Sequence, residues 1–289
     1  MSGGKVFKVG ERTYSRTEQP YVMGILNVTP DSFSDGGKYF SVDEALEQAH
    51  FMVDEGADFI DVGGESSRPG AEPVSLAEEM HRVIPVIEKL SGSISVPISV
   101  DTTKAEVARE ALSTGATIVN DVSAMREDPK MPSVVASSGA TVILMHMLGT
   151  PRSMQDNPYY DDLISEVHSF LSDRLSVALD AGIAADRILI DPGIGFGKRL
   201  QDNFEILGRL GEFSDLAPVL IGPSRKSFIG NTLNLPVEER QYGTAAAVSV
   251  VTLNGADVIR VHDVKEMVQV IKITSRCMTT ADRGETVST

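Results

Sequence analysis

Polar or charged side chains follow nearly every short apolar run of this 289-residue chain. The apolar run 188–190 ends at Asp191, after which come Pro192 and three alternating glycines at positions 193, 195 and 197. Proline removes a backbone donor, and glycine permits a positive φ and a close approach of a ligand to the backbone. The stretch therefore predicts a buried strand that delivers a carboxylate to the start of a ligand-binding loop. Taken alone, it fits a buried capping aspartate and a left-handed turn equally well.

The same arrangement recurs along the chain, and the recurrence favours a shared site. Other apolar runs lead to the polar residues Asn27, Asp61, Asp101, Asn120 with Asp121, His146, Lys226, and Arg260 with His262. Buried charges destabilise a fold unless they are paired, so a purely structural sheet needs few of them. Singly, Asp101 fits a helix cap, and His146 is best interpreted as a hydrogen-bonded core histidine. Independent caps do not explain why all these residues occur at the same end of consecutive strands.

These side chains are of two chemical kinds. Asp101, Asn120 and Asp191 offer acceptors, with one amide donor, which suits a flat heterocycle that carries ring N–H and amino groups. The second kind is cationic or can become so, and in a chain of net charge −15 such a group suits a phosphate or diphosphate. Its members are Arg68, Arg225, Lys226, Arg260 and His262.

A metal site is less strongly indicated. No histidine or cysteine cluster has the spacing of a zinc site. Asn27, together with phosphate oxygens, could hold Mg²⁺, which takes oxygen ligands and accepts few of them from protein.

Regular alternation of apolar runs and helical segments defines the fold that must position these residues. Gly-Ala-Asp or Gly-Ala-Thr triplets at 56–58, 115–117, 139–141 and 255–257 each precede an apolar run, and each glycine stands where a helix ends. With the runs at 21–27, 97–101, 188–191 and 219–222, they make about eight β/α units and predict a parallel sheet. We expect a single (β/α)₈ TIM barrel. An open doubly wound sheet is the alternative, but no GxGxxG phosphate loop follows Asn27.

Three regions follow from this pattern. Residues 1–18 are expected to form an N-terminal β-hairpin and lead-in, because residues 5–14 alternate around Gly10 and Glu11. Residues 19–275 form the barrel, and residues 276–289 form a polar C-terminal tail. Long loops at 28–40, 64–74 and 147–160 each follow a strand, so they belong to the C-terminal rim, where barrel active sites lie.

Composition narrows the partners and the compartment. Twenty-six basic against 41 acidic residues disfavour binding to nucleic acid or anionic membranes. The longest apolar-rich run, 245–253, is shorter than the roughly 20 residues of a membrane-spanning helix. A lone cysteine and no visible secretory leader favour the cytoplasm. Apolar faces on the late helices are consistent with a homodimer.

Two long segments carry a resemblance to a known family. Residues 23–37, MGILNVTPDSFSDGG, closely resemble the first signature of the dihydropteroate synthases, and residues 63–70, GGESSRPG, resemble their second loop. Shorter matches at 98–102, 120–123, 145–147, 191–198, 224–227 and 260–262 span nearly the whole chain in order. Ser67 stands where that loop usually has a threonine. Serine keeps the hydroxyl group but lacks the methyl group that packs near the substrate.

The resemblance implies a TIM-barrel transferase of folate biosynthesis, in a family targeted by sulfonamides. Such an enzyme condenses 4-aminobenzoate with (7,8-dihydropterin-6-yl)methyl diphosphate, giving 7,8-dihydropteroate and diphosphate. The implied pterin ligands are Asp101, Asn120, Asp191 and Lys226, with Met145, Phe196 and Gly222 around the ring. The implied diphosphate ligands are Asn27 with Mg²⁺, Arg68, Arg260 and His262. The aminobenzoate side is Phe33, Ser67, Pro69 and Ser227, and the implied catalytic residues are Asp101, Lys226, Asp35 and Arg68.

We expect an electrostatic mechanism, because no Ser-His-Asp or Cys-His signature supplies a nucleophile. Diphosphate departs early, cationic groups stabilise it, and Asp101 and Asp191 stabilise the positive charge left on the pterin.

A second interpretation of the function is a barrel that presents methyltetrahydrofolate to a corrinoid partner. Such a barrel has no use for a diphosphate site. A third is a non-catalytic scaffold, which would not bind a pterin diphosphate analogue.

Overall fold

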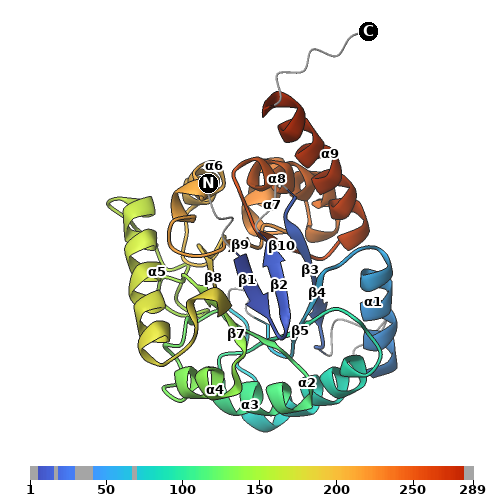
Figure 1. Ribbon diagram of the computed structural model, residues 1–289. Coiled ribbons are helices and arrows are strands. Elements are labelled where there is room, and N and C mark those ends of the chain that lie inside the picture. Colours follow the sequence, from blue (N-terminus) through green and yellow to red (C-terminus); the bar gives the residue numbers. More distant parts are fainter. Residues whose placement is uncertain (1–5, 16–18, 30–41, 67–69, 283–289) are drawn as a thin grey trace.

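Eight parallel strands form the centre of the molecule. The computed structural model describes residues 6–15, 19–29, 42–66 and 70–282. Neighbouring strands of the sheet follow the order β8-β7-β6-β5-β4-β3-β10-β9, and a bridge between Ile190 and Val219 joins its two edges. The closed sheet confirms the predicted TIM barrel (Figure 1). The strands are β3 (Tyr21–Asn27), β4 (Phe59–Gly63), β5 (Ile98–Asp101), β6 (Ile118–Asp121), β7 (Thr141–Met145), β8 (Ile188–Asp191), β9 (Leu220–Ile221) and β10 (Val258–Val261).

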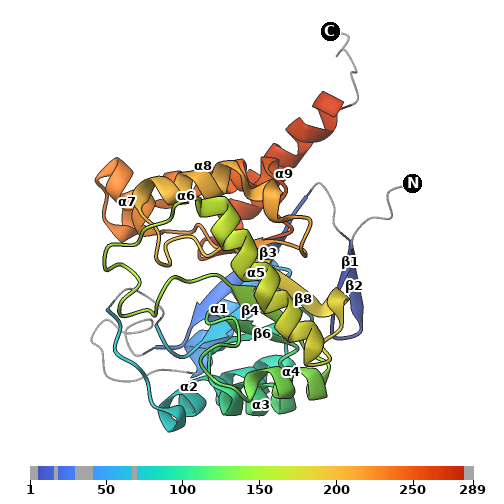
Figure 2. The same ribbon diagram turned by 90° about the vertical axis from the view of Figure 1, so that its left-hand side faces the viewer.

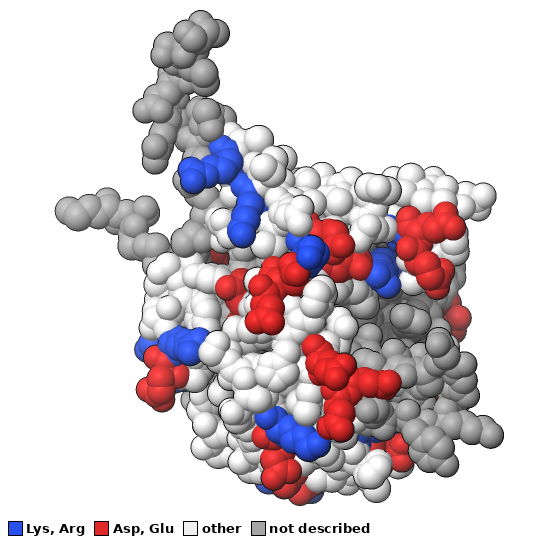
Figure 3. All heavy atoms as spheres, turned by 90° about the vertical axis from the view of Figure 1, so that its right-hand side faces the viewer, with Lys and Arg blue, Asp and Glu red and all other residues white. Residues whose placement is uncertain are grey.

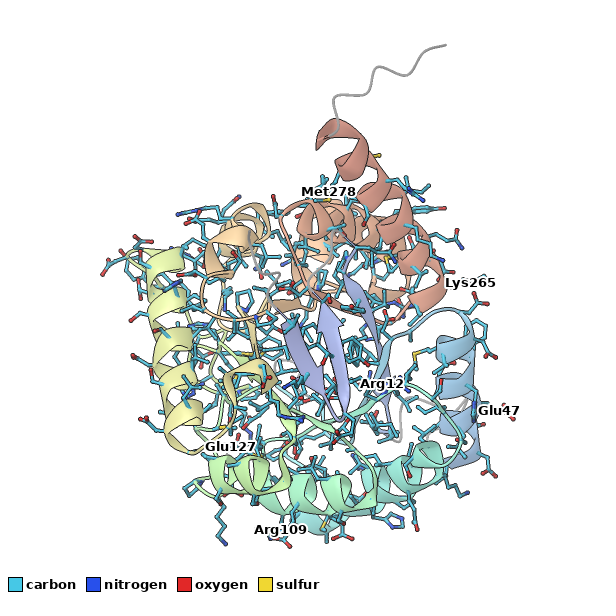
Figure 4. All side chains as sticks on the ribbon, in the orientation of Figure 1. Arg12, Glu47, Arg109, Glu127, Lys265 and Met278 are labelled. Carbon is cyan, nitrogen blue, oxygen red and sulfur yellow. The ribbon has the colours of Figure 1, made fainter. Side chains whose placement is uncertain are left out.

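A ring of helices surrounds the strands, and the glycine triplets end those that the sequence indicates. Gly56, Gly115, Gly139 and Gly255 all have positive φ, which lets each chain segment turn from a helix into the next strand. Outward helix faces carry charge, as shown by Glu47, Arg109 and Lys265 (Figure 4). The helices are α1 (Val42–Asp54), α2 (Leu76–Ser91), α3 (Ala105–Thr114), α4 (Met131–Ser138), α5 (Leu163–Asp180), α6 (Leu200–Gly208), α7 (Ser227–Leu233), α8 (Gln241–Leu253) and α9 (Val264–Asp282).

Side chains inside the barrel lie in layers, because every second residue of a strand faces the same side. One buried layer is apolar and consists of Met23, Phe59, Ile118, Ile143, Leu189, Leu220 and Val258. Two residues further along the same strands, the chain supplies Ile25, Asp61, Asn120, Met145, Asp191, Gly222 and Arg260. The barrel interior therefore changes from apolar to polar toward the carboxyl ends of the strands.

A β-hairpin closes the opposite end of the barrel, as predicted. Strands β1 (Val6–Val9) and β2 (Arg12–Ser15) pair antiparallel, and Phe7 packs with the apolar layer. The ring of Phe7 stacks on Tyr14 at 5.2 Å, and Tyr14 lies 5.0 Å from Phe59. Figure 2 shows the hairpin at the end of the barrel away from segment 147–160. Access to the polar layer is therefore from the carboxyl ends of the strands.

The last helix extends into the segment that is expected to form the polar C-terminal tail. Helix α9 extends to Asp282, whereas the tail is expected to begin at residue 276. Thr274 donates a hydrogen bond to Ser249 of α8 at 3.4 Å, and Ser275 is buried, so this part of the helix packs on the barrel. No glycine or proline interrupts residues 264–282. The sequence of this segment therefore contains no helix-breaking residue that would end α9 before the expected tail.

Candidate active site

Strand register brings the predicted acceptors to one level of the barrel mouth. Asp101 pairs with Gly63 on one side and with Asn120 on the other, while Met145 pairs with Asp191. These residues occupy the carboxyl ends of β4 to β8, where the parallel strands leave the apolar layer. The predicted joint placement of acid and amide groups is therefore present in the folded chain.

One arginine joins the two aspartates on one side of this mouth. Arg260 donates from Nε to Asp61 Oδ2 at 2.6 Å and from Nη2 to Asp101 Oδ2 at 2.9 Å. Asn120 Nδ2 donates to the same Asp61 oxygen at 3.0 Å. The sequence predicts that Asp61 lies at a strand end but indicates no role for it. Its function in the fold is to fix Asn120 and Arg260, which in turn hold Asp101.

Burial controls the ionisation of Asp101. Burial raises the pKa of Asp101 to about 7, Arg260 acts in the opposite direction, and the neighbouring acids Asp61, Glu79 and Asp121 raise it further. The guanidinium is thus the group that favours the charged carboxylate in an otherwise acidic surrounding.

Asp191 presents a second carboxylate across the mouth. Its Oδ1 accepts a hydrogen bond from Gly193 N at 2.7 Å, so the glycine loop clamps the side chain. Burial raises the pKa of Asp191 to about 6, against the opposing effects of the Gly193 N–H and of Lys226, Lys198 and Arg260. The glycine loop at 193–197 therefore orients the Asp191 carboxylate through the Gly193 N–H.

An apolar wall and a lysine complete the opening. Lys226 Nζ lies 4.1 Å from the ring centre of Phe196, and Phe196 is buried with Met145, Met147 and Met154. Lys226 is the N-cap residue of α7, and Ser227, the first residue of that helix, is exposed. A planar ligand between the wall and the carboxylates would contact sulfur and aromatic groups on its faces and polar groups on its edge.

The predicted cations are distributed unequally. Arg225 binds both oxygens of Asp263, with Nη2 2.5 Å from Oδ1, so this guanidinium ties two rim loops together. His262 lies against Ser224, with Nδ1 3.0 Å from the hydroxyl oxygen. Arg260, which is expected to bind the diphosphate, is paired with the carboxylates of Asp61 and Asp101.

Asn27 ends β3 and pairs in register with Gly63, at the level of Asp101. Its side chain is half-buried at the mouth. Other predicted residues, namely Phe33, Asp35, Ser67, Arg68 and Pro69, lie outside the described residues, and their roles stay predictions.

A cavity of about 470 Å³ adjoins the acid side of the mouth. Asp101 lines it from β5, and Glu65, Val122, Arg126 and Met147 line it from the loops that follow the strands. Its volume is in the range of sites that hold small organic ligands. Glu127, labelled in Figure 4, lies at its edge.

Two buried residues behind Asp191 extend the predicted site. His146 is buried and accepts from Lys198 Nζ at Nδ1, at 2.9 Å, which confirms the interpretation as a core histidine. Lys198 is the last residue of the glycine motif, and the sequence alone indicates no role for it. The only available sequence signal was its position one residue after the third alternating glycine.

Comparison with known proteins agrees with this geometry. A family model described as pterin binding enzyme matches residues 23–262. The dihydropteroate synthase of Synechocystis sp. is 48% identical over 267 residues, which is 92% of each chain. A Yersinia pestis dihydropteroate synthase, solved with a sulfonamide drug complex, superimposes with a TM-score of 0.90 at 44% identity, covering 95% of this chain and 99% of the other. The Xanthomonas albilineans enzyme with 4-aminobenzoic acid gives 0.88 at 43% identity, covering 98% and 100%.

Proposed function

Because this chain belongs to the pterin binding enzyme family, we infer that it performs the dihydropteroate synthase reaction. It is a transferase that joins 4-aminobenzoate to (7,8-dihydropterin-6-yl)methyl diphosphate, releasing diphosphate and forming 7,8-dihydropteroate. One observation carries this conclusion: Asp101, Asn120 and Asp191 stand together at the carboxyl end of the barrel, beside an apolar wall. The relatives of similar length that bear the name of this activity support it.

The pterin would lie between the wall and the carboxylates. Asp101 and Asp191 accept from its ring N–H and amino groups, and Asn120 supplies a further polar contact. Lys226 donates to the pterin from the opposite edge, while Met145 and Phe196 cover its faces. Gly222, at the end of β9, contributes no side chain, which leaves room for the ring.

Charge stabilisation is the mechanism that these groups support best. The bond between the pterin methylene and the diphosphate oxygen breaks, and its electron pair leaves with diphosphate. Positive charge grows on the methylene and pterin, where Asp101 and Asp191 stabilise it in a site of low polarity. The neutral aromatic amine of 4-aminobenzoate then forms the new C–N bond and loses a proton. No activated nucleophile is required for this step.

We propose that the diphosphate is bound by Asn27, Arg68 and His262. Arg260 contributes positive charge between the carboxylates that it pairs with and the diphosphate. Mg²⁺ commonly takes one or two protein oxygens together with substrate phosphates, so a single carboxamide at Asn27 fits it. Among the described residues no group of three or more His, Cys, Asp or Glu side chains could hold a metal on its own. When bound, Mg²⁺ would neutralise charge on the departing diphosphate.

The aminobenzoate is assigned to the outer side of the mouth. Ser227 is exposed directly after Lys226, so its hydroxyl can reach a ligand that approaches from solvent. Phe33, Ser67 and Pro69 are proposed as its partners on the two rim loops, and Asp35 and Arg68 as catalytic residues on the same loops.

The rival functions make different demands on the site. A methyl-carrying pterin barrel releases no diphosphate, and a scaffold binds no pterin diphosphate. The length of the match to dihydropteroate synthases, and the 4-aminobenzoic acid bound to one of them, favour the transferase. Calorimetry with a non-hydrolysable pterin diphosphate analogue tests the scaffold, because a scaffold would give no binding heat.

We also propose that the enzyme is a cytoplasmic homodimer that binds neither nucleic acid nor membranes. Within the described residues, no helix is long and apolar enough to cross a membrane. Acidic and basic side chains are interspersed on the face drawn in Figure 3, in a chain of net charge −15. Three apolar side chains, Val250, Leu253 and Ile273, are exposed on α8 and α9, which pack together and offer a surface for a second copy.

The reaction itself is tested with the purified chain, both substrates, and Mg²⁺ present or removed by chelation. We expect dihydropteroate and diphosphate in equal amounts, formed much faster with Mg²⁺. Diphosphate or product missing in the presence of Mg²⁺ would exclude the transferase function. Equal rates after chelation would exclude the metal but leave the transferase function intact.

A further inference from the structure

Lys104 joins the two ends of the loop between β4 and α2, the loop to which Arg68 belongs. Its Nζ donates to Glu65 Oε2 at the start of that loop and to Glu79 Oε2 in the first turn of α2. Lys104 itself follows β5 and is the N-cap residue of α3. One ammonium group therefore connects both ends of the loop to the segment that follows the neighbouring strand.

The link to Glu79 is strong because this side chain is buried. Glu79 has no exposed surface, and its Oε1 has no hydrogen-bond partner. In the described part of the chain, Lys104 is the only cation that pairs with Glu79. Burial raises the pKa of Glu79, and the hydrogen bond from Lys104 is the largest effect in the opposite direction. Loss of the ammonium would therefore leave a buried carboxylate without its cation, which is strongly unfavourable.

Lys104 keeps its own charge in this position. Burial lowers its pKa, but the hydrogen bonds to Glu65 and Glu79 outweigh burial and raise the pKa above the ordinary value of a lysine. Glu65 is about one-third exposed, so its carboxylate remains partly hydrated beside the ammonium. The three side chains therefore form a compact group with one cation between two acids.

The residue before Glu65 is fixed by separate contacts with α2. Arg82 Nη1 donates to the Gly64 carbonyl at 2.8 Å. A Cβ at Gly64 would lie 2.7 Å from Val83 Cγ1, so the backbone packs directly on the helix. Lys104 therefore acts on Glu65, the first residue beyond these contacts.

This group lies beside the proposed pterin ligands. Gly63, the last residue of β4, pairs in register with Asp101, and Lys104 follows Asp101 by three positions. Glu65 and Glu79 line the cavity that adjoins Asp101. The Asp101 carboxylate is paired with Arg260, so Lys104 is not needed to hold it.

We propose that Lys104 is a positioning residue that holds the loop between β4 and α2 in the conformation that binds the diphosphate group of the pterin substrate. The identity of the bound group rests on the proposed function, which assigns Arg68 of this loop to the diphosphate. A loop whose ends are fixed before binding loses less conformational entropy when the ligand binds. The contacts of Lys104 are present in the ligand-free chain, so they can be tested without the reaction.

Four variants separate this link from a general effect of charge. Lys104→Met removes the ammonium and keeps an unbranched side chain. Lys104→Arg keeps the charge and can donate to two carboxylates, so it should restore the wild-type properties. Lys89→Met is the matched control, because Lys89 of α2 makes a single exposed ion pair, with Asp43 at 3.3 Å. Lys104→Met combined with Glu79→Gln removes the unpaired buried charge, for use if Lys104→Met does not fold.

The direct measurement is amide hydrogen exchange in the ligand-free chain. We expect exchange in residues 64–66 and 70–79 to become about tenfold faster in Lys104→Met and in the double variant, and to stay unchanged in Lys104→Arg and Lys89→Met. Unchanged exchange in a folded variant that lacks the ammonium would overturn the proposal. Equally fast exchange in Lys89→Met would also overturn it, because the effect would then not depend on the position of the charge.

A second measurement links the loop to the diphosphate. In Lys104→Met we expect the Kd for a non-hydrolysable pterin diphosphate analogue to rise about tenfold, and the Kd for 6-hydroxymethylpterin, which lacks the diphosphate, to stay unchanged. An equal loss of affinity for both ligands would overturn the proposal, because it would indicate a general disturbance of the mouth. If the wild-type chain bound neither ligand, the proposed function would fail, while hydrogen exchange would still decide whether Lys104 fixes the loop.

A double-mutant cycle tests whether Lys104 acts through Glu65. Glu65→Ala and Lys104→Met are compared singly and together in the affinity for the pterin diphosphate analogue. We expect the combined loss to be clearly smaller than the sum of the two single losses, because both substitutions break the same ion pair. Additive losses would show that Lys104 does not act through the start of the loop, and would contradict the proposal.

Discussion

At the scale of single residues, the site depends on buried carboxylates, and neighbouring cations and N–H groups favour the charged forms of Asp101 and Asp191 against the effect of burial. Arg260 holds Asp61 and Asp101 on one side, and the Gly193 N–H holds Asp191 on the other. Such carboxylates are costly in the free protein, because water is removed without full compensation. They become favourable when positive charge develops between them, which is the condition of a departing diphosphate.

Replacement of Asp101 by asparagine tests this directly. Asp101→Asn keeps the shape and an acceptor but removes the charge, so we expect kcat to fall about 100-fold, with a smaller change in the KM for the pterin substrate. Glu127→Gln, at the exposed edge of the adjoining cavity, is the matched control and should retain wild-type turnover. Turnover of Asp101→Asn close to the wild-type value would show that the carboxylate does not stabilise the cation.

At the scale of elements, the loop after β8 shows why a motif can be read from sequence while its contacts cannot. The alternating glycines indicate an unusual backbone, and Gly193, Gly195 and Gly197 do have positive φ. The bond between Lys198 and His146 joins residues 52 positions apart. No local pattern specifies such a pair, because it depends on how the loop after β8 folds over the end of β7.

Gly193 is predicted to be the least replaceable of these glycines. A Cβ at this position would lie 1.9 Å from the carbonyl oxygen of His146, at a φ of +73°. We expect Gly193→Ala to lower the free energy of unfolding by about 3 kcal/mol, because both the clash and the backbone conformation are unfavourable. Gly139→Ala, at a φ of +67° with nothing within 4 Å, isolates the backbone contribution and should lower it by only about 1 kcal/mol. Urea unfolding of both variants measures the difference, and equal losses would contradict the clash.

At the scale of the whole molecule, the strand order and the polar mouth could be predicted from sequence, and the side-chain pairing could not. Strands β3, β6 and β8 begin and end where the apolar runs indicate, whereas β9 is only two residues long, and Val219 joins the sheet through an isolated bridge. The pairing of Arg260 with Asp61 spans β3, which lies between their strands. It arises because parallel pairing of these three strands directs both side chains into the barrel interior.

The assembly is predicted to depend on the exposed apolar face of α8 and α9. Ile273 is 70% exposed near the hydrogen bond between Thr274 and Ser249 that joins these helices. Introduction of a charge by Ile273→Asp should convert a dimer into a monomer in sedimentation velocity, because burying the carboxylate in an apolar interface is unfavourable. Lys272→Asp, on the neighbouring exposed position, controls for a general effect of charge. A wild-type protein that sediments as a monomer at micromolar concentration would contradict the proposed dimer.

The opposed acids and cations of the mouth suit a reaction in which diphosphate departs, and charge separates, before the C–N bond forms. A secondary kinetic isotope effect on kcat/KM, measured with two deuterium atoms on the pterin methylene, reports how far that carbon has become cationic in the transition state. We predict a clearly normal effect, in which the substrate with ordinary hydrogen on the methylene reacts faster than the deuterated substrate. A value of one or below would show that the amine attacks while diphosphate is still bound to carbon, and would contradict the mechanism.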